Sequence, residues 1–227
     1  MSEEKKYKQL RKLGQELHIP VPEAFWEFEV FDKEGKLIQK YKQRSHSWVR
    51  NAYNFLLSFM SKKMGETTGF GAGYLSAKRY TGEITGPYFD DGNTLETAGK
   101  GFRGDVASTV NGILVGSGTN AESFEDFALQ TLIANGTGAG QLSYVLSEVP
   151  TKSYNAGTKV WTVTHIRYFN NNSGGDVSVN EVAIVAEDYA SASYYYTYSR
   201  DKLSATVTIP NTGQLKATYT IQLTYPS

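Results

Sequence analysis

Polar and apolar residues alternate along much of the C-terminal half of the chain. The alternation is most regular in residues 161–168, where Trp161 and Val163 alternate with threonines. It resumes in residues 177–181, which lead into an apolar run at residues 182–185. Asn, Ser and Gly residues separate the two runs at residues 170–176. A period of two among β-branched and aromatic residues is typical of strands, and Asn and Gly favour turns. The pattern predicts two antiparallel strands joined by a turn, at the centre of a β domain.

The same alternation predicts further strands on both sides of this pair. Residues 25–31 and 36–41 flank a turn sequence at residues 32–35, which predicts a β-hairpin. Other predicted strands cover residues 111–119, 142–149, 194–201, 205–210 and 215–225. Many short strands separated by polar turns indicate a mainly β fold, and we expect an antiparallel β-sandwich or jelly-roll-like domain.

Helical periodicity first occurs close to the N-terminus. Tyr7, Leu10 and Leu13 form a thin apolar stripe that predicts a short helix within residues 3–17. The two prolines of residues 18–22 then favour an extended backbone. We interpret residues 1–24 as an arm and linker, which is either a frayed terminus or an arm that docks on a neighbouring subunit.

A longer helix is predicted at about residues 46–63, in the N-terminal half. Trp48, Ala52 and Phe55 fall on one face of it, and this wide apolar face must pack on a sheet. A single helical turn, capped by Ser123, is expected at the start of residues 123–129.

The remaining residues are expected to form one β-rich domain, residues 25–227, with an irregular insertion. The insertion, at about residues 65–111, is rich in glycine and has no regular period. Long irregular segments in compact proteins are usually functional or are ordered by a partner. We therefore expect these residues at the surface, where another chain can order them.

The composition of the chain argues against several classes of function. Lys and Arg number 23, as do Asp and Glu, so the formal net charge is zero and no direct nucleic-acid binding is predicted. The chain has no cysteine, which excludes disulfides and thiolate metal sites. The charged N-terminus has no signal-peptide pattern, and no apolar run reaches the roughly 20 residues of a membrane span. No membrane partner is predicted.

The sequence contains no recognisable catalytic, cofactor-binding or metal-binding motif. His18, His46 and His165 lack metal-ligand spacing, and His165 is expected to be packed or paired within its strand. Residues 90–93 could offer oxygen ligands to calcium, but a solvated turn is the simpler interpretation. The adjacent carboxylates of residues 125–126 do not define a glycosidase pair. We expect a protein that is not an enzyme and needs no cofactor.

A tyrosine cluster is the main surface candidate. Tyr194, Tyr196 and Tyr198 share one face of a predicted strand, and Tyr195 points to the other face. These tyrosines either pack as ordinary strand residues, stack on sugars, or bury against another subunit.

The order of three sequence blocks resembles that of a viral family. The blocks are Ser45–Asn54 after the turn at residues 32–36, Gly116–Thr119 before Ser123–Leu129, and Phe169–Gly175 before Val179–Ile184, with Arg200–Leu203 beyond. This order is similar to that in uncharacterised β-rich structural proteins of tailed bacteriophages and related archaeal viruses. The resemblance covers most of residues 25–225, except the glycine-rich middle, and its motifs are structural.

The resemblance implies a virion component, made in the host cytoplasm, that contacts other copies of itself and other virion proteins. We favour a tail or head–tail accessory protein over the major shell. The expected contact residues are Tyr7, Leu10, Leu13, Tyr194, Tyr196 and Tyr198. The alternative is a carbohydrate-binding β-sandwich that binds a surface glycan in host recognition, and a polysaccharide-degrading enzyme is a weaker third hypothesis.

Overall fold

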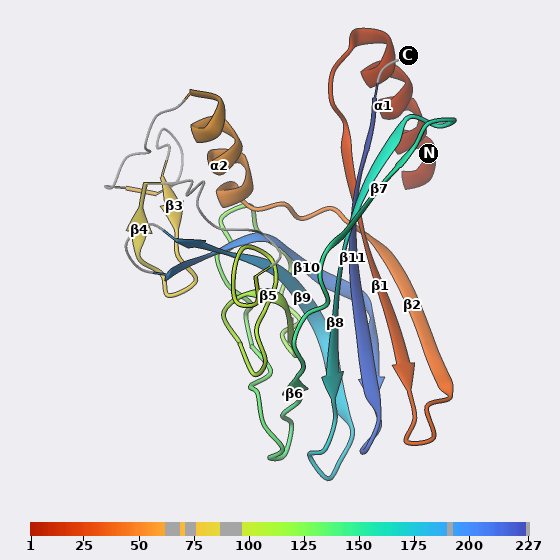
Figure 1. Ribbon diagram of the computed structural model, residues 1–227, viewed down its shortest axis with the longest axis vertical. Helices are drawn as coiled ribbons and strands as arrows, with labels where there is room; N and C mark the ends of the chain where they lie inside the picture. The colour runs from red at the N-terminus through yellow and green to blue at the C-terminus, as the bar shows by residue number, and fades with distance from the viewer. Residues whose placement is uncertain (62–68, 71–75, 87–96, 190–192, 226–227) are drawn as a thin grey trace.

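The computed structural model describes residues 1–61, 69–70, 76–86, 97–189 and 193–225. Within these residues the fold is mainly β with two helices, and all pairings between strands are antiparallel (Figure 1). The helices are α1 (Glu3–Leu17) and α2 (Arg50–Ser61). The strands are β1 (Pro22–Phe31), β2 (Leu37–Ser45), β3 (Ala77–Lys78), β4 (Ile84–Thr85), β5 (Gly112–Gly116), β6 (Ser143–Tyr144), β7 (Thr151–Asn155), β8 (Val160–Asn170), β9 (Val177–Tyr189), β10 (Ser193–Ile209) and β11 (Gln214–Thr224). The predicted mainly β, antiparallel class is confirmed.

The described strands form two large sheets and a small hairpin. A six-stranded sheet has the order β2-β1-β11-β8-β6, with β7 also paired to β8, and a three-stranded sheet has the order β10-β9-β5. The inward side chains of β1, among them Trp26 and Phe28, share one core with the apolar run of residues 182–185 in β9. Two sheets facing each other across one core are consistent with a β-sandwich.

Strands β8 to β11 form one long ribbon that folds over this core. β8 pairs with β11 in the six-stranded sheet, whereas β9 pairs with β10 in the three-stranded sheet. Asn171 links the connection between β8 and β9 to the connection between β10 and β11. Its Nδ2 donates to the Ile209 carbonyl at 2.8 Å, and its backbone N–H donates to the Gly213 carbonyl at 2.9 Å. Both strands predicted from the alternation are therefore present, but they lie in different sheets and pair with other strands, so the expectation of a central pair is wrong.

Several strand boundaries differ from the prediction. The strands predicted at residues 194–201 and 205–210 are parts of the single strand β10, which ends at Ile209. Register shifts accommodate the intervening residues without ending the pairing with β9. Only Ser143–Tyr144 of the strand predicted at residues 142–149 is in a sheet. The sequence did not predict β7, whose residues are all exposed.

The helices also differ in part. The predicted N-terminal helix is confirmed as α1, but α2 begins at Arg50 because the preceding backbone contacts β10. Trp48 forms a β-bridge with Ser199, and the Val49 N–H donates to the Tyr198 carbonyl. Residues 62–63 of the predicted helix lie outside the described residues. The helical turn expected in residues 123–129 is a hydrogen-bonded turn and not a helix.

Arg167 organises the described part of the glycine-rich insertion nearest to β5. Its side chain is fully buried, and its guanidinium donates to the carbonyl oxygens of Asp105, Ser108, Asn111, Ile113 and Val145. Burial lowers the pKa of Arg167 to about 10. A Cβ on Gly104 would lie 2.7 Å from Arg167 Nη1, so glycine is required there for the loop to close around the guanidinium. Much of the rest of the insertion lies outside the described residues.

Candidate binding groove

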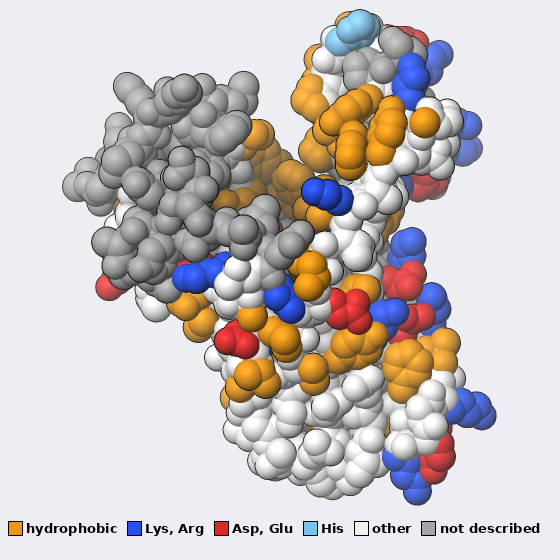
Figure 2. Space-filling model, viewed as in Figure 1, with side chains coloured by type: hydrophobic (Ala, Val, Ile, Leu, Met, Phe, Trp, Pro, Cys, Tyr) orange, Lys and Arg blue, Asp and Glu red, His pale blue; other side chains and the backbone are white. Residues whose placement is uncertain are grey.

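An apolar groove of about 690 Å³ lies between the two helices. The two sheets diverge toward the helices (Figure 1). The start of β1, the start of β8 and the end of β11 lie near α1, whereas the end of β9 and the start of β10 lie near α2. Hydrophobic side chains line the hollow between the α1 and α2 regions (Figure 2). The groove therefore occupies the part of the molecule where neither sheet covers the other.

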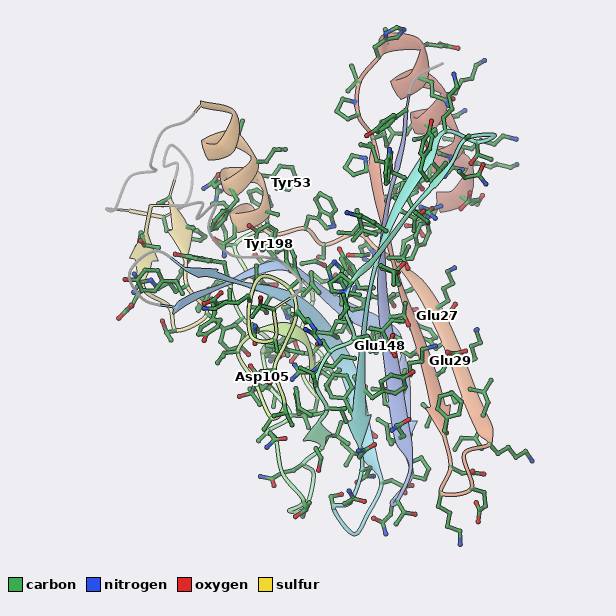
Figure 3. All side chains as sticks on the ribbon, in the orientation of Figure 1. Glu27, Glu29, Tyr53, Asp105, Glu148 and Tyr198 are labelled. Carbon is green, nitrogen blue, oxygen red and sulfur yellow. The ribbon has the colours of Figure 1, made fainter. Side chains whose placement is uncertain are left out.

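The groove is lined from both helices and from both sheets. One wall is formed by Tyr7 and Leu10 of α1 and by the linker residues 19–21, and the other by Ala52, Tyr53 and Leu56 of α2. The floor contains Ala24, Phe102, His165, Ile184, Tyr198, Tyr219 and Ile221. Tyr53 lies on the side of α2 that faces α1 (Figure 3). Leu10 is 47% exposed and Leu56 is 57% exposed, so both walls present apolar side chains to solvent.

One residue of the floor, His165, has a buried polar atom. His165 is 8% exposed, its ring packs edge-on against Phe102, and its Nδ1 has no hydrogen-bond partner among the described residues. Burial lowers the pKa of His165 to about 4, so the imidazole is neutral at pH 7. Its cross-strand neighbour Tyr219 is satisfied, because the hydroxyl accepts a hydrogen bond from Trp48 Nε1 at 3.1 Å. The packing expected for His165 is confirmed.

Charged side chains, and not the leucines of the apolar stripe, hold α1 against the sheet. Arg11 and Arg44 both pair with the buried carboxylate of Glu23 in β1, and Arg44 also pairs with Glu4 at 2.6 Å. The Arg44 guanidinium lies 4.0 Å from the centre of the Tyr7 ring. These cations lower the pKa of Glu4, which favours its ionised form. α1 is therefore fixed by its charged face.

The predicted contact residues of α1 keep their exposed position in this arrangement. Leu10 and Leu13 are exposed, and so is the following stripe residue Leu17, whereas Tyr7 is half-buried under Arg44. The groove brings Tyr7 and Leu10 together with α2, and Leu13 lies outside its lining.

The tyrosine face of β10 is covered by other parts of the same chain. Tyr196 is buried against Phe55 of α2 at a ring distance of 4.8 Å, so the expectation of an exposed contact residue at this position is wrong. Tyr194 stacks under the Arg79 guanidinium at 3.5 Å. Only Tyr198 of the three reaches the groove. The alternation placed these tyrosines on one face correctly, but it carried no signal that α2 packs on that face.

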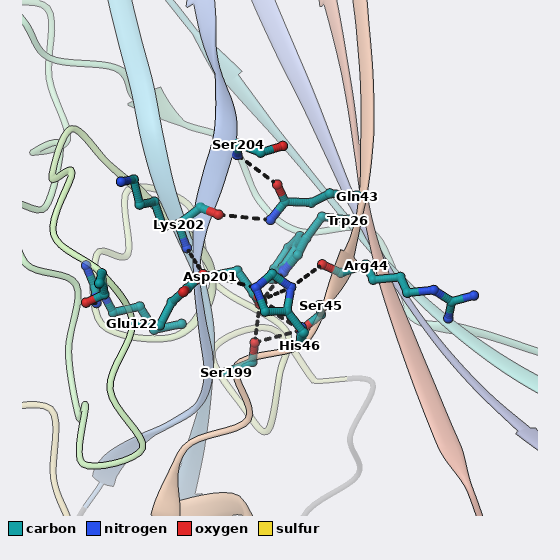
Figure 4. Close-up of polar contacts among 12 residues, drawn as sticks. Trp26, Gln43, Arg44, Ser45, His46, Glu122, Ser199, Asp201, Lys202 and Ser204 are labelled. Atoms are coloured by element: carbon teal, nitrogen blue, oxygen red, sulfur yellow. Dashed lines mark hydrogen bonds and ion pairs between the residues drawn. The ribbon is translucent and has the colours of Figure 1, made fainter. Parts of the chain in front are cut away.

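A polar network borders the groove where β2 leads into α2 (Figure 4). Asp201 of β10 is fully buried, and its Oδ2 accepts hydrogen bonds from Trp26 Nε1 at 2.8 Å, Ser45 Oγ at 2.7 Å and Ser199 Oγ at 2.5 Å. Its Oδ1 accepts the backbone N–H of His46 at 2.9 Å. The side chains of His46 and Glu122 complete the cluster. Sequence spacing could not reveal it, because the residues come from distant segments.

The adjacent carboxylates of residues 125–126 are both paired with arginines. Glu125 pairs with Arg50 at the start of α2, which lowers the pKa of Glu125, and Asp126 pairs with Arg200 at 2.7 Å. Arg200 also pairs with the fully buried Glu181 at 2.8 Å. Asp126 therefore anchors the segment between β5 and β6 to β10, and Glu125 anchors it to α2. Residues 90–93 lie outside the described part of the chain.

No family model, curated protein or solved structure matches this chain. Among the described residues, neither helix is long and apolar enough to cross a bilayer.

Proposed function

We propose that this protein is a non-enzymatic structural component of a viral particle, and that it assembles with other copies of itself through the groove between α1 and α2. The observation that carries the proposal is the exposed apolar lining shared by the two walls, represented by Leu10 and Leu56. Contiguous apolar surface of this kind on a soluble protein typically marks a contact with another macromolecule. A tail or head–tail accessory role, in a virion assembled from protein made in the host cytoplasm, remains the preferred setting.

The mode of α1 attachment supports an assembly role. Salt bridges to Glu23 hold the helix in place, and its stripe of Leu10, Leu13 and Leu17 is left facing outward. A helix that served only its own fold would bury this stripe, because burial of apolar area is the main stabilising term of helix packing. In the proposed assembly, a neighbouring copy covers the stripe and the groove.

The proposal is tested by one charge substitution in the groove wall and one matched control. Leu10→Asp places a charge in the contact surface, whereas Leu37→Asp changes a leucine of similar exposure, 44% against 47%, in the hairpin strand β2. We expect light scattering after size exclusion to show that Leu10→Asp lowers the assembled mass and that Leu37→Asp does not. Equal masses for the two variants, or a wild-type monomer at all concentrations, would contradict the proposal.

The architecture is also compatible with a jelly-roll-like domain. In the ribbon of β8 to β11, the segment β8–β9 and the segment β10–β11 each cross the core. Each segment therefore contributes one strand to each of the two sheets. Ribbons folded over in this way are the building unit of jelly rolls, which are common in capsid proteins. We infer the jelly-roll-like relationship from this ribbon.

A carbohydrate-binding role is the second candidate, favoured by an exposed aromatic cluster. Tyr154, Trp161 and Tyr225 are exposed at the ends of three neighbouring strands, and the Tyr154 ring lies 5.2 Å from Trp161 and 6.1 Å from Tyr225. Aromatic faces with a polar tip suit contacts that are partly apolar and partly hydrated. Glycan-array binding that is lost in Tyr154→Ala but kept in Leu10→Asp would favour this role over assembly.

A further inference from the structure

Three potential metal ligands from distant parts of the chain meet beside the groove. His46 lies in the connection from β2 to α2, Glu122 in the segment between β5 and β6, and Asp201 in β10. One ligand atom from each residue lies within 4.8 Å of the other two. Ligand atoms around a tetrahedral zinc ion are about 3.3 Å apart, given metal–ligand bonds of about 2.0–2.1 Å. On binding an ion, the three atoms would therefore move closer together by up to about 1.5 Å.

Hydrogen bonding sets which nitrogen of His46 is free. His46 Nδ1 lies 3.2 Å from the Arg44 carbonyl oxygen, which can only accept, so the ring proton of a neutral His46 resides on Nδ1. Nε2 then carries a lone pair and lies 3.5 Å from Glu122 Oε1. A lone pair facing a carboxylate oxygen is repulsive unless a cation lies between them. Metal-binding histidines commonly have this arrangement, with the second ring nitrogen donating to a backbone carbonyl.

The carboxylate of Asp201 also lacks a matching cation. It is fully buried, and none of the described lysines or arginines forms an ion pair with it. Among the described residues, three donors hold Oδ2, whereas Oδ1 accepts only the His46 backbone N–H and lies 3.9 Å from His46 Nδ1. An ionised carboxylate in a buried site is costly without a positive charge nearby. The donors on Oδ2 fix the orientation of the group, as hydrogen bonds around metal ligands do.

We propose that His46, Glu122 and Asp201 form a binding site for a divalent transition-metal ion, of which Zn²⁺ is the representative. One imidazole and two carboxylates are a donor set that suits zinc and related ions, whereas Ca²⁺ takes six to eight oxygen ligands. The side chain of His46 is 49% exposed, so solvent can supply a further ligand. The bound ion links the start of the α2 wall to β10 and to the segment that carries Glu122.

The ligand most suitable for substitution is His46, because it is exposed and Asp201 is part of the buried network. Zn²⁺ is titrated into the EDTA-treated full-length protein by calorimetry at pH 7.5. We expect one equivalent to bind, with at least tenfold weaker binding in His46→Ala and in Glu122→Gln. His18→Ala is the matched control, because His18 is an exposed histidine in the linker after α1 and its loss is expected to leave binding unchanged. CaCl2 in place of ZnCl2 is expected to bind weakly or not at all.

Thermal unfolding provides a second measurement. Zn²⁺ is expected to raise the Tm of the wild type and of His18→Ala, and to leave the Tm of His46→Ala unchanged, because binding to the folded state stabilises it. Absence of Zn²⁺ binding to the wild type, or equal binding in His46→Ala, would overturn the proposal. The Leu10→Asp variant is expected to bind Zn²⁺ normally, so this result is separable from the test of assembly.

Discussion

The two ends of the six-stranded sheet have the same alternation of inward and outward side chains, but they differ in how far the inward side chains are buried. At one end, the inward side chains Phe169 and Leu215 are fully buried under the three-stranded sheet. At the other end, the corresponding inward side chains lie beyond that sheet, and Trp161 of β8 is 36% exposed. The strands are continuous from the closed end to the open end. A period of two therefore identifies the apolar face of a strand, but does not show how much of that face the same chain covers.

The two ends also differ in whether their buried polar groups have hydrogen-bond partners. At the closed end, the five carbonyl oxygens around Arg167 are satisfied by one guanidinium. At the open end, His165 Nδ1 has no partner among the described residues, and leucines of both helices face solvent. We infer that the closed end supplies most of the stability and that the open end is available for binding. The predictions below test this division.

The largest effect is expected at the closed end, for Arg167→Met. The substitution leaves five buried carbonyl oxygens without their donor, and it is expected to lower the free energy of unfolding by about 4 kcal/mol. Urea unfolding followed by fluorescence measures the change. Arg167→Lys keeps the charge but has fewer hydrogen-bond donors, and its loss of stability is expected to be smaller than that of Arg167→Met. A variant as stable as the wild type would contradict the role given to the closed end.

The next effect concerns His165, at the open end. Its folded-state pKa of about 4 is below the ordinary value of 6.5, so the unfolded chain takes up a proton that the folded chain excludes. This contribution to stability is fully present above pH 6.5 and decreases as the pH falls toward 4, by about 3 kcal/mol in all. His165→Gln is expected to show a smaller stability loss between pH 7 and pH 4 in urea unfolding. Identical pH profiles for both proteins would refute the prediction.

A smaller and local effect is expected for Glu23→Gln. The substitution removes the carboxylate that pairs with Arg11 and Arg44, and it is expected to weaken the docking of α1 by about 1.5 kcal/mol. Hydrogen exchange within α1 is expected to accelerate while exchange in β8 and β11 remains slow. Lys12→Gln, which removes an exposed pair with Glu16 on the same helix, is the control. Acceleration throughout the sheets would instead mean that α1 is integral to the core.

The smallest effect on stability is expected for Leu13→Ser on α1. The side chain is 52% exposed, so its replacement is expected to change the free energy of unfolding by less than about 0.5 kcal/mol. Urea unfolding at a concentration at which the protein is monomeric isolates this quantity from assembly. A loss comparable to that of Arg167→Met would show that the stripe is buried within the monomer.

Local sequence patterns were sufficient for much of the fold, including β8, β9 and α1. They failed where tertiary contacts override local preference. The helical pattern extends back to residue 46, but Trp48 and Val49 are held by β10, so α2 starts at Arg50. The interruption after Lys202 suggested a strand end, whereas pairing with β9 continues through a register shift.

The candidate sites were less predictable than the fold. The exposed stripe of α1 could be read from Leu10 and Leu13, because helical spacing alone places them on one face. The groove could not be predicted from the sequence, because its walls and floor come from segments whose relative positions depend on the sheet topology. The same holds for the cluster of His46, Glu122 and Asp201, which has no characteristic spacing in the sequence.

The ionic attachment of α1 makes its position sensitive to the solution. Screening by added salt weakens contacts between partly exposed charges such as Arg11 and Glu4, whereas salting-out anions such as sulfate strengthen apolar association. The two influences act on opposite faces of one helix. Moderate sulfate concentrations are therefore expected to weaken the exposed pair of Arg11 with Glu4, and in the proposed assembly to favour burial of the exposed leucines.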